Sequence, residues 1–355
     1  MFKNLFIENK VKPKFNPCEI IDKELVYYFS KFINPFDTET KILDTSTLFN
    51  IESIVPPVKN IINLRKINTI DTVNTFFESI NKKLPDGGVF IGCVETYNER
   101  RARIYENTPK FFSKVIYFYD FIVHRVFPKI SVTRGIYRHM FYDTNKAYSY
   151  TEAFGRLFSC GFEVTNSTVI NNLLYFICKK TREPFYDEEP TTGIIYKMNR
   201  VGKDGKIIKV YKIRTMNHYA EYLQGFIFKM NKLKEGGKFQ NDFRITSWGK
   251  FLRKYWIDEI PMLWNFVRGD IKLVGVRPLS KHYFELYTNE LKELRLKVKP
   301  GLLPPFYADA PKTFEEIMES EKKYLEAYQK NPFKTDFKYF FKILRNILLN
   351  KARSS

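Results

Sequence analysis

Asp258 and Glu259 are adjacent acidic residues, and they are the pair in this sequence best suited to chemistry. Neighbouring carboxylates repel each other, so a cation usually lies between them. A divalent metal held by such a pair, with arginines nearby, suits phosphoryl transfer, because cations neutralise phosphate oxygens while one carboxylate attacks or takes a proton. An acidic helix start before a proline is the simpler alternative for the two residues taken alone. The surrounding motifs favour phosphoryl transfer.

The acidic pair lies in a block of polar motifs between residues 196 and 301. The order and spacing of these motifs resemble those of the bacterial sugar transferase family, the monotopic polyprenyl-phosphate phosphoglycosyl transferases. Six separated motifs in sequence order make the resemblance specific, and it covers residues from about 190 to 355. Besides the acidic pair, the motifs are 199–206, 211–216, 241–253, 263–265, 269–278 and 299–301.

The resemblance implies a two-step reaction. Asp258 would attack the β-phosphate of a UDP-sugar, form a phosphosugar–enzyme ester and release UMP. Glu259 would help to hold Mg²⁺, with Asp258 as a second metal ligand, and would assist the phosphate of undecaprenyl (polyprenyl) phosphate in the second step. A carboxylate suits this role because it is ionised at neutral pH and forms a labile acyl phosphate. The implied product begins a surface polysaccharide, such as an exopolysaccharide, or a glycoconjugate.

Basic residues must neutralise the phosphates of both substrates. Arg277 and Pro278 lie where the family has Gly-Pro-Arg-Pro, and a guanidinium group binds phosphate in a bidentate geometry that lysine cannot offer. Lys212 and Arg214 alternate in a strand predicted over 207–215, so their side chains should share one face and reach one phosphate. A solvated strand edge is the alternative for that pair.

Arg244 and Arg253 are weaker candidates for substrate binding, since basic residues on a basic chain are usually surface residues. Asp242 and Asp270 are expected to support these arginines rather than to contact substrate.

Two departures from the family pattern bear on activity. The family commonly reads Pro-Gly-Ile-Thr-Gly-Leu-Trp, whereas this chain reads Pro-Gly-Leu-Leu-Pro-Pro-Phe-Tyr over 300–307, which stiffens a loop expected to line the substrate site. Family members also carry an apolar re-entrant helix before the transferase motifs, but residues 179–190 are too charged to enter a bilayer. Sugar preference, and activity itself, therefore stay open.

Composition predicts a protein that contacts a membrane surface. The chain has 59 Lys and Arg against 39 Asp and Glu, a formal charge of +20, and 17% aromatic residues. Basic groups attract anionic headgroups and aromatic rings favour the interface. Nucleic acid is not expected as a partner, because no zinc-ligand, helix-turn-helix or RNP-like pattern accompanies the charge. We expect a location on the cytoplasmic face of the inner membrane, peripheral or monotopic, without a transmembrane helix.

Two aromatic and basic segments could make that contact. Residues 110–138 combine apolar and basic residues at helical spacing, as expected for one amphipathic interfacial helix. Residues 337–351 show the same period. Packing on the protein core is the alternative for both.

The first part of the chain is predicted to form a separate domain. We predict an α/β domain over 1–182, a linker over 183–190 and an α+β transferase domain over 191–355. In the first domain, strands near 60–64 and 89–95, a helix near 69–82, a capping box opening a helix at 149–152 and two strands ending at Cys178 indicate a layered Rossmann-like fold.

This domain resembles the C-terminal half of class I methyltransferases, with Leu-Pro-Asp-Gly-Gly at 84–88 before a strand and Cys-Gly-Phe at 160–162 after a helix. No Gly-x-Gly-x-Gly loop follows an early strand, so the backbone could not approach S-adenosylmethionine. We interpret it as a cofactor-free remnant. The alternatives to a transferase are therefore an inactive membrane-associated partner and, less favoured, an S-adenosylmethionine-dependent methyltransferase.

Overall fold

The chain divides into two compact units. The computed structural model describes residues 21–141, 145–186, 193–230 and 242–349. The division falls between Tyr186 and Asp187, except that Lys129–Arg134 and Ser149–Gly155 belong to unit 2. The predicted linker over 183–190 lies partly outside the described residues.

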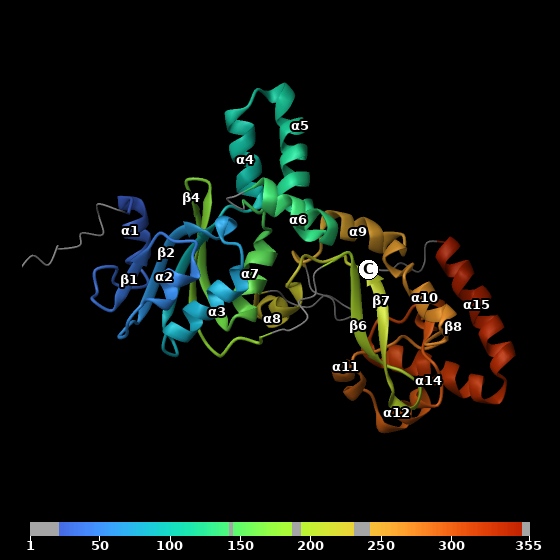
Figure 1. Cartoon of the computed structure of the whole chain (residues 1–355). Helices are drawn as coiled ribbons and strands as arrows, with labels where there is room; N and C mark the ends of the chain where they lie inside the picture. The colour runs from blue at the N-terminus through green and yellow to red at the C-terminus, as the bar shows by residue number, and fades with distance from the viewer. Residues whose placement is uncertain (1–20, 142–144, 187–192, 231–241, 350–355) are drawn as a thin grey trace, which may run out of the picture. The chain divides into compact units, whose positions relative to one another are not determined.

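Unit 1 is built on a five-stranded mixed sheet in the order β1–β2–β3–β5–β4 (Figure 1). The first three strands pair in parallel, and β5 runs antiparallel to both β3 and β4. This confirms the predicted α/β class, and the predicted strands correspond to β2, β3, β4 and β5. The strands are β1 (Thr40–Leu43), β2 (Asn60–Lys66), β3 (Val89–Val94), β4 (Phe162–Ile170) and β5 (Leu173–Lys180).

Helices pack on both faces of this sheet. The ring of Phe29, in α1 (Lys23–Phe29), lies 5.8 Å from that of Tyr175. The ring of Phe77, in α3 (Val73–Lys83), lies 6.5 Å from that of Phe176. Neighbouring strand residues point to opposite faces, so the adjacent Tyr175 and Phe176 define a three-layered unit.

A helical hairpin extends from the sheet of unit 1 (Figure 1). It consists of α4 (Tyr97–Asn107) and α5 (Lys110–Phe121), and unit 1 also contains α2 (Leu48–Glu52). Helices α6 (Ser131–Met140) and α7 (Tyr150–Ser159) each have residues assigned to both units. The amide of Glu152 donates to the Ser149 hydroxyl over 3.0 Å, as expected for the predicted cap.

The prediction of a single helix over 110–138 is wrong. After α5 the chain forms a π-helical turn, Ile122–Val126, and a 3₁₀ turn, Phe127–Lys129, before α6 begins. Pro128 has no amide hydrogen to continue a helix.

Unit 2 combines an antiparallel hairpin, β6 (Ile195–Val201) with β7 (Ile207–Ile213), and a parallel pair, β8 (Lys272–Val274) with β9 (Gly301–Leu303). A Cβ on Gly301 would lie 2.2 Å from the backbone nitrogen of Gly275, so the parallel pair depends on glycine at this point. The pair brings the motifs at 269–278 and 299–301 together.

The helices of unit 2 surround these strands, and their buried core includes Leu291, Tyr324 and Ile343. The helices are α8 (Gln224–Met230), α9 (Ser247–Lys254), α10 (Met262–Val267), α11 (Lys281–Glu285), α12 (Asn289–Leu296), α13 (Phe306–Asp309), α14 (Phe314–Lys330) and α15 (Pro332–Leu348). Within the described ranges, no helix has both the length and the apolar character needed to cross a bilayer.

Candidate active site

The acidic pair lies on a tight turn between α9 and α10. Trp256 adopts a left-handed backbone with φ of 55°, and a 3₁₀ turn, η7 (Ile257–Glu259), follows it. A non-glycine residue in this region is strained, and such strain is often found at functional sites. The turn buries Asp258, which is 5% exposed. Its Oδ1 atom has no hydrogen-bond partner among the described residues.

Lys212 of β7 joins this turn. Its Nζ donates to Glu259 Oε1 over 2.6 Å, and both side chains are largely buried. Burial raises the pKa of the Asp258 carboxyl; the Lys212 ammonium opposes that rise, and the Glu259 carboxylate adds to it. The sequence prediction that these three side chains act together agrees with this arrangement.

The strand that carries Lys212 is fixed by Asn265, a fully buried residue of α10. Asn265 Oδ1 accepts from the Tyr211 amide over 3.0 Å, and Nδ2 donates to the Lys209 carbonyl over 2.7 Å. The same Nδ2 donates to Asp270 over 3.1 Å. Asn265 therefore sets the position of Lys212 relative to the acidic turn.

Arg253, at the end of α9, also lies near the pair. Its Nε donates to the Thr215 hydroxyl over 2.9 Å. Burial lowers the pKa of Arg253, whereas the negative charge of Asp258 raises it. Helix α9 packs closely against the Thr215 backbone because residue 249 is glycine. A Cβ there would lie 1.9 Å from the Thr215 carbonyl oxygen.

Arg277 is an exposed residue after β8. Its positive charge lowers the pKa of Arg253 and of Arg200, in both cases after the larger effect of burial. Guanidinium groups that repel one another in this way form a site for a polyanion. Arg277 is held through its carbonyl oxygen, which accepts from Arg295 Nη2 over 2.5 Å. Arg295 in turn forms a buried ion pair with Glu321.

The other predicted binding residues lie in different environments. Arg244 is buried and makes a bidentate pair with Asp242, at 2.7 Å for the shortest contact, so Asp242 supports an arginine as expected. Asp270 instead accepts from Asn265 and lies 3.5 Å from Arg268. Pro278 is buried.

Arg214 does not join the acidic pair in the structure. The predicted strand ends at Ile213, and Arg214 Nε donates to the Gly193 carbonyl over 2.9 Å. Its guanidinium also lies 4.8 Å from the Tyr196 ring. Tyr196 is the cross-strand partner of Lys212, so Arg214, which lies over the Tyr196 ring, is on the same face as Lys212, as the alternation predicts. The two cations nevertheless have different partners.

The altered loop after Gly301 reaches the acidic turn through an aromatic contact. The Tyr307 hydroxyl accepts from Trp256 Nε1 over 3.2 Å, and the two rings meet edge to face at 5.9 Å. Tyr307 therefore packs against the residue that begins the turn.

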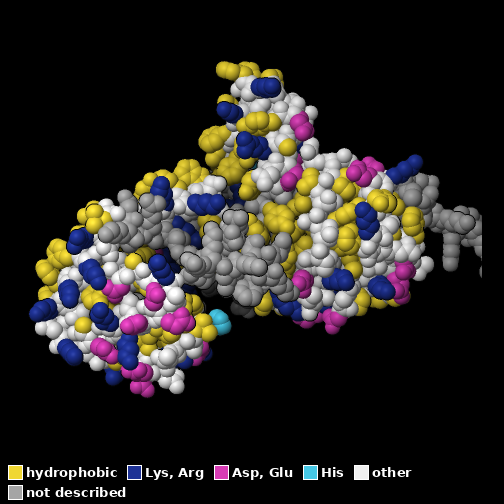
Figure 2. All heavy atoms as spheres, turned by 180° about the vertical axis from the view of Figure 1, so that it is seen from behind, with side chains coloured by type: hydrophobic (Ala, Val, Ile, Leu, Met, Phe, Trp, Pro, Cys, Tyr) yellow, Lys and Arg dark blue, Asp and Glu magenta, His cyan; other side chains and the backbone are white. Residues whose placement is uncertain are grey.

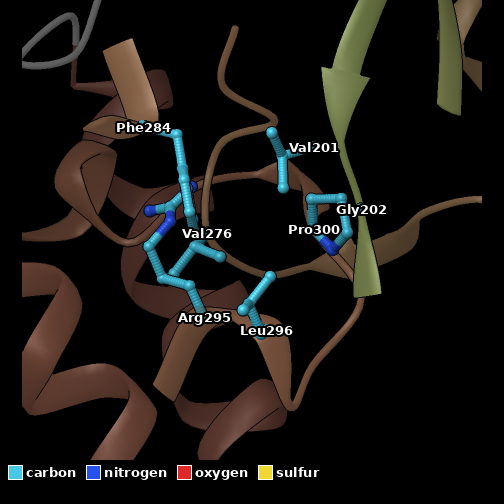
Figure 3. Close-up of a pocket in the computed structure, with 7 residues that line it drawn as sticks. All are labelled: Val201, Gly202, Val276, Phe284, Arg295, Leu296 and Pro300. Atoms are coloured by element: carbon cyan, nitrogen blue, oxygen red, sulfur yellow. The ribbon is translucent and has the colours of Figure 1, made fainter. Parts of the chain in front are cut away.

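A small pocket lies beside the backbone that carries Arg277 (Figure 3). Its cavity volume is about 10 Å³, far below the roughly 300–1,000 Å³ of typical ligand sites. Neither Asp258 nor Glu259 lines it. The pocket is lined by Val201, Gly202, Val276, Phe284, Arg295, Leu296 and Pro300.

Sequence reasoning missed several of these residues. Asn265 and Arg200 were each inside a recognised motif, and that was the only available signal. Arg295 lies outside every motif, and its role depends on a buried contact that spacing does not reveal.

The site thus combines a buried carboxylate, whose Oδ1 has no partner in the described part of the chain, with an adjacent acid paired with lysine and with nearby arginines, a combination typical of functional sites. The bacterial sugar transferase profile matches residues 160–350, more than half of the chain. The chain therefore belongs to the bacterial sugar transferase family. The match includes β4 and β5 of unit 1.

Individual relatives are similar over shorter stretches. The galactosyl transferase CpsE of Streptococcus agalactiae is 33% identical over 159 residues, which cover 44% of this chain and 34% of that protein. The undecaprenyl-phosphate galactose phosphotransferase of Salmonella typhimurium is 36% identical over 113 residues, or 30% and 24% of the two chains. The UDP-glucose:undecaprenyl-phosphate glucose-1-phosphate transferase of Klebsiella pneumoniae is 37% identical over 111 residues, or 31% and 22%. The alignments thus span between 22% and 34% of each relative's own length.

Proposed function

We propose that this chain transfers a sugar 1-phosphate from a UDP-sugar to undecaprenyl or another polyprenyl phosphate, at the cytoplasmic face of a membrane. The observation that carries the proposal is the buried Asp258 carboxylate beside the Lys212–Glu259 ion pair, because its Oδ1 finds no partner among the residues that the structure describes. An unsatisfied buried oxygen is costly to keep, so a bound ligand is the simplest reason for it. The named activities of the relatives support this substrate class.

In the first step, an Asp258 carboxylate oxygen attacks the β-phosphorus of the UDP-sugar. The bond between that phosphorus and the bridging oxygen breaks, and UMP leaves with the bonding electrons. Arg253 and Arg277 neutralise the diphosphate, and the buried environment strengthens these interactions. The product is an acyl phosphate that joins Asp258 to the sugar phosphate.

In the second step, an oxygen of the lipid phosphate attacks the same phosphorus and releases the Asp258 carboxylate. Glu259 takes any proton that this phosphate carries, and its ion pair with Lys212 holds the carboxylate beside Asp258. The result is a polyprenyl diphosphate sugar and the regenerated enzyme.

The acidic pair also fits a Mg²⁺ ion. Proteins commonly hold Mg²⁺ through one or two carboxylates and leave its other positions to phosphates and water. Asp258 Oδ1 and the Glu259 carboxylate would supply those two ligands, and the ion would supply charge neutralisation for the diphosphate. The described residues contain no group of three or more His, Cys, Asp or Glu that could hold a metal, so substrate would complete the coordination.

The membrane part of the proposal rests on exposed aromatic side chains near the acidic turn. Trp248 and Phe251 of α9 are 75% and 49% exposed, and Trp264 of α10 is 59% exposed. Lys250 and Lys254 lie on the same helix as the first two. Rings and basic groups of this kind favour a headgroup layer.

The described part of the apolar stripe over 337–351 is partly buried in the core and partly exposed to solvent. Tyr339 and Ile343 of α15 are buried in the core of unit 2. Phe337 and Leu348 are 64% and 73% exposed.

A donor screen tests the function. Purified chain, Mg²⁺, polyprenyl phosphate and a series of UDP-sugars are assayed for UMP release, and one donor should give turnover. Asp258→Asn should abolish it. The matched control is Asp204→Asn, which makes the same chemical change at an exposed residue whose φ of 56° also suits asparagine. Unchanged release in Asp258→Asn would remove Asp258 as the nucleophile, and failure of every donor while vesicle binding persists would favour an inactive membrane-associated partner.

A further inference from the structure

Helix α5 of unit 1 presents its apolar side chains to solvent. The exposed fractions are 85% for Phe111, 66% for Val115 and 65% for Phe118. These positions are spaced by four and three residues, so they form one stripe on the helix. Phe112, Ile116 and Tyr119 are 55%, 40% and 68% exposed and widen it. Soluble proteins rarely expose a contiguous apolar patch of this kind unless it binds something.

The opposite face of α5 is polar and is the face that the protein buries. Ser113 is 1% exposed, and its hydroxyl accepts from the Thr108 hydroxyl over 2.9 Å. Asp120 receives two hydrogen bonds from Arg100 of α4, at 2.6 and 2.8 Å. Helix α5 therefore buries its polar face and exposes its apolar face, the opposite of a helix that covers a hydrophobic core.

The base of the hairpin is fixed firmly to the sheet. Arg100 is 2% exposed and lies 3.5 Å from Glu95, the residue that follows β3. Arg103 of α4 lies 2.5 Å from the same carboxylate, and the Glu95 amide donates to Asn68 over 2.8 Å. Because Glu95 and Arg100 are buried and paired, and Arg100 also binds Asp120, these charged contacts hold the orientation of α4 and α5. The outward direction of the apolar stripe is thus set by the fold of unit 1.

Basic side chains accompany the stripe. Lys110 and Lys114 of α5 and Arg101 of α4 are exposed, whereas Glu106 is the exposed acid on these two helices within the described residues. Figure 2 shows basic and hydrophobic side chains together on the projecting hairpin. Phenylalanine rings flanked by lysine suit a headgroup layer that carries negative charge.

We propose that the α4–α5 hairpin is a membrane-binding element that inserts the α5 stripe into an anionic bilayer surface. The hairpin lies before residue 160, outside the stretch that matches the transferase family, so the family match does not account for it. The proposal does not depend on the transfer reaction. Its occupant is a lipid surface and not a second copy, because the stripe is paired with exposed positive charge that two copies would bring together.

A labelled full-length chain tests the insertion. Val115→Cys carries an environment-sensitive fluorophore, and Phe49→Cys is the control, since Phe49 is 75% exposed on α2 of the same unit. Cys18 is replaced by serine. Cys93, Cys160 and Cys178 stay, because they are buried and burial raises the pKa of Cys93 and of Cys160 to about 12. Phosphatidylglycerol-rich vesicles should shift the emission of the label at 115 to the blue, and spin-labelled lipids should quench it. Pure phosphatidylcholine should act more weakly, and the label at 49 should not respond.

A second pair of variants measures affinity. Phe111→Ser combined with Phe118→Ser should weaken vesicle binding about tenfold or more, since each ring gains roughly 1.5–3 kcal/mol when fully buried. Phe49→Ser should bind as the parent does. UMP release in detergent should be unchanged in both variants, which separates this proposal from the proposed function. A chain that floats with vesicles while the label at 115 stays unchanged would overturn the proposal. So would a label that responds to protein concentration without vesicles, which would indicate a second copy.

Discussion

Replacing Asp258 with asparagine should stabilise the fold while it abolishes turnover. In the wild type the folded chain buries a carboxylate whose Oδ1 has no hydrogen-bond partner among the described residues. An unsatisfied buried polar atom costs about 1–3 kcal/mol, and more when charged. The attraction of Lys212 and Arg253 for the negative charge offsets part of that cost. We therefore expect Asp258→Asn to raise the free energy of unfolding by about 1 kcal/mol.

The pH dependence of that gain follows from the direction of the pKa shift. The folded state raises the pKa of Asp258 above the ordinary 3.8, so between the two values the folded chain binds more protons than the unfolded chain. The contribution of Asp258 to stability is then fully present below about pH 3.8 and is lost as pH rises through the folded-state pKa. The stability advantage of Asp258→Asn should vanish at the acid end and reach its full size above the folded-state pKa.

Urea unfolding followed by circular dichroism across pH, with UMP release in parallel, measures both effects. Asp204→Asn should change neither. A structural carboxylate would behave in the opposite way, because its removal would break hydrogen bonds. Loss of more than about 1 kcal/mol in Asp258→Asn would therefore refute the view that this residue is kept for chemistry.

Three further predictions concern the groups around Asp258. Asn265→Ala should lower the free energy of unfolding by about 2–5 kcal/mol, because the Tyr211 amide and the Lys209 carbonyl lose buried partners. In Asn265→Ala, hydrogen exchange should show faster loss of the Tyr211 amide proton. The control Arg268→Ala, which removes an exposed ion pair with Asp270, should leave that exchange rate unchanged. Lys212→Met should move the acid limb of the kcat/KM profile to higher pH, since the ammonium that opposes the raised pKa of Asp258 is gone; an unmoved limb would mean that another group titrates. Arg277→Lys keeps the positive charge but loses the bidentate hydrogen-bond geometry of the guanidinium, so kcat/KM should fall about tenfold. Full activity would show that Arg277 does not bind a phosphate.

The elements that the sequence predicted best are those with strong local signals. Turn glycines marked the start of β3, and the Ser149 hydroxyl marked the start of α7. The parallel pair β8–β9 was missed, because each strand has three residues and forms only where Gly275 and Gly301 allow two backbones to meet. β1, with four residues, was missed for a similar reason. Short strands are defined by their partners and not by their own composition.

The sequence does not show which partner a side chain meets when that partner comes from a distant element. Lys212 and Arg214 have the same charge and share a strand face, yet the first contacts Glu259 and the second contacts Gly193 and Tyr196. Alternation predicts a face but not the group that meets it. The hydrogen bond from Arg295 to the Arg277 carbonyl could not be predicted for the same reason, because Arg295 lies on α12, a segment that contains no motif.

The two units use buried charge for different ends. In unit 1, Arg100 satisfies Asp120 with two hydrogen bonds, so the charges are neutralised and the hairpin is held in one orientation. In unit 2, Asp258 Oδ1 has no hydrogen-bond partner among the described residues, and burial and the charge of neighbouring arginines lower the pKa of Arg253 near it. Satisfied networks rigidify a fold, whereas unsatisfied ones store free energy that a ligand can release. The charges at the base of the α4–α5 hairpin are therefore structural, whereas the unsatisfied oxygen of Asp258 is what the proposed reaction would use.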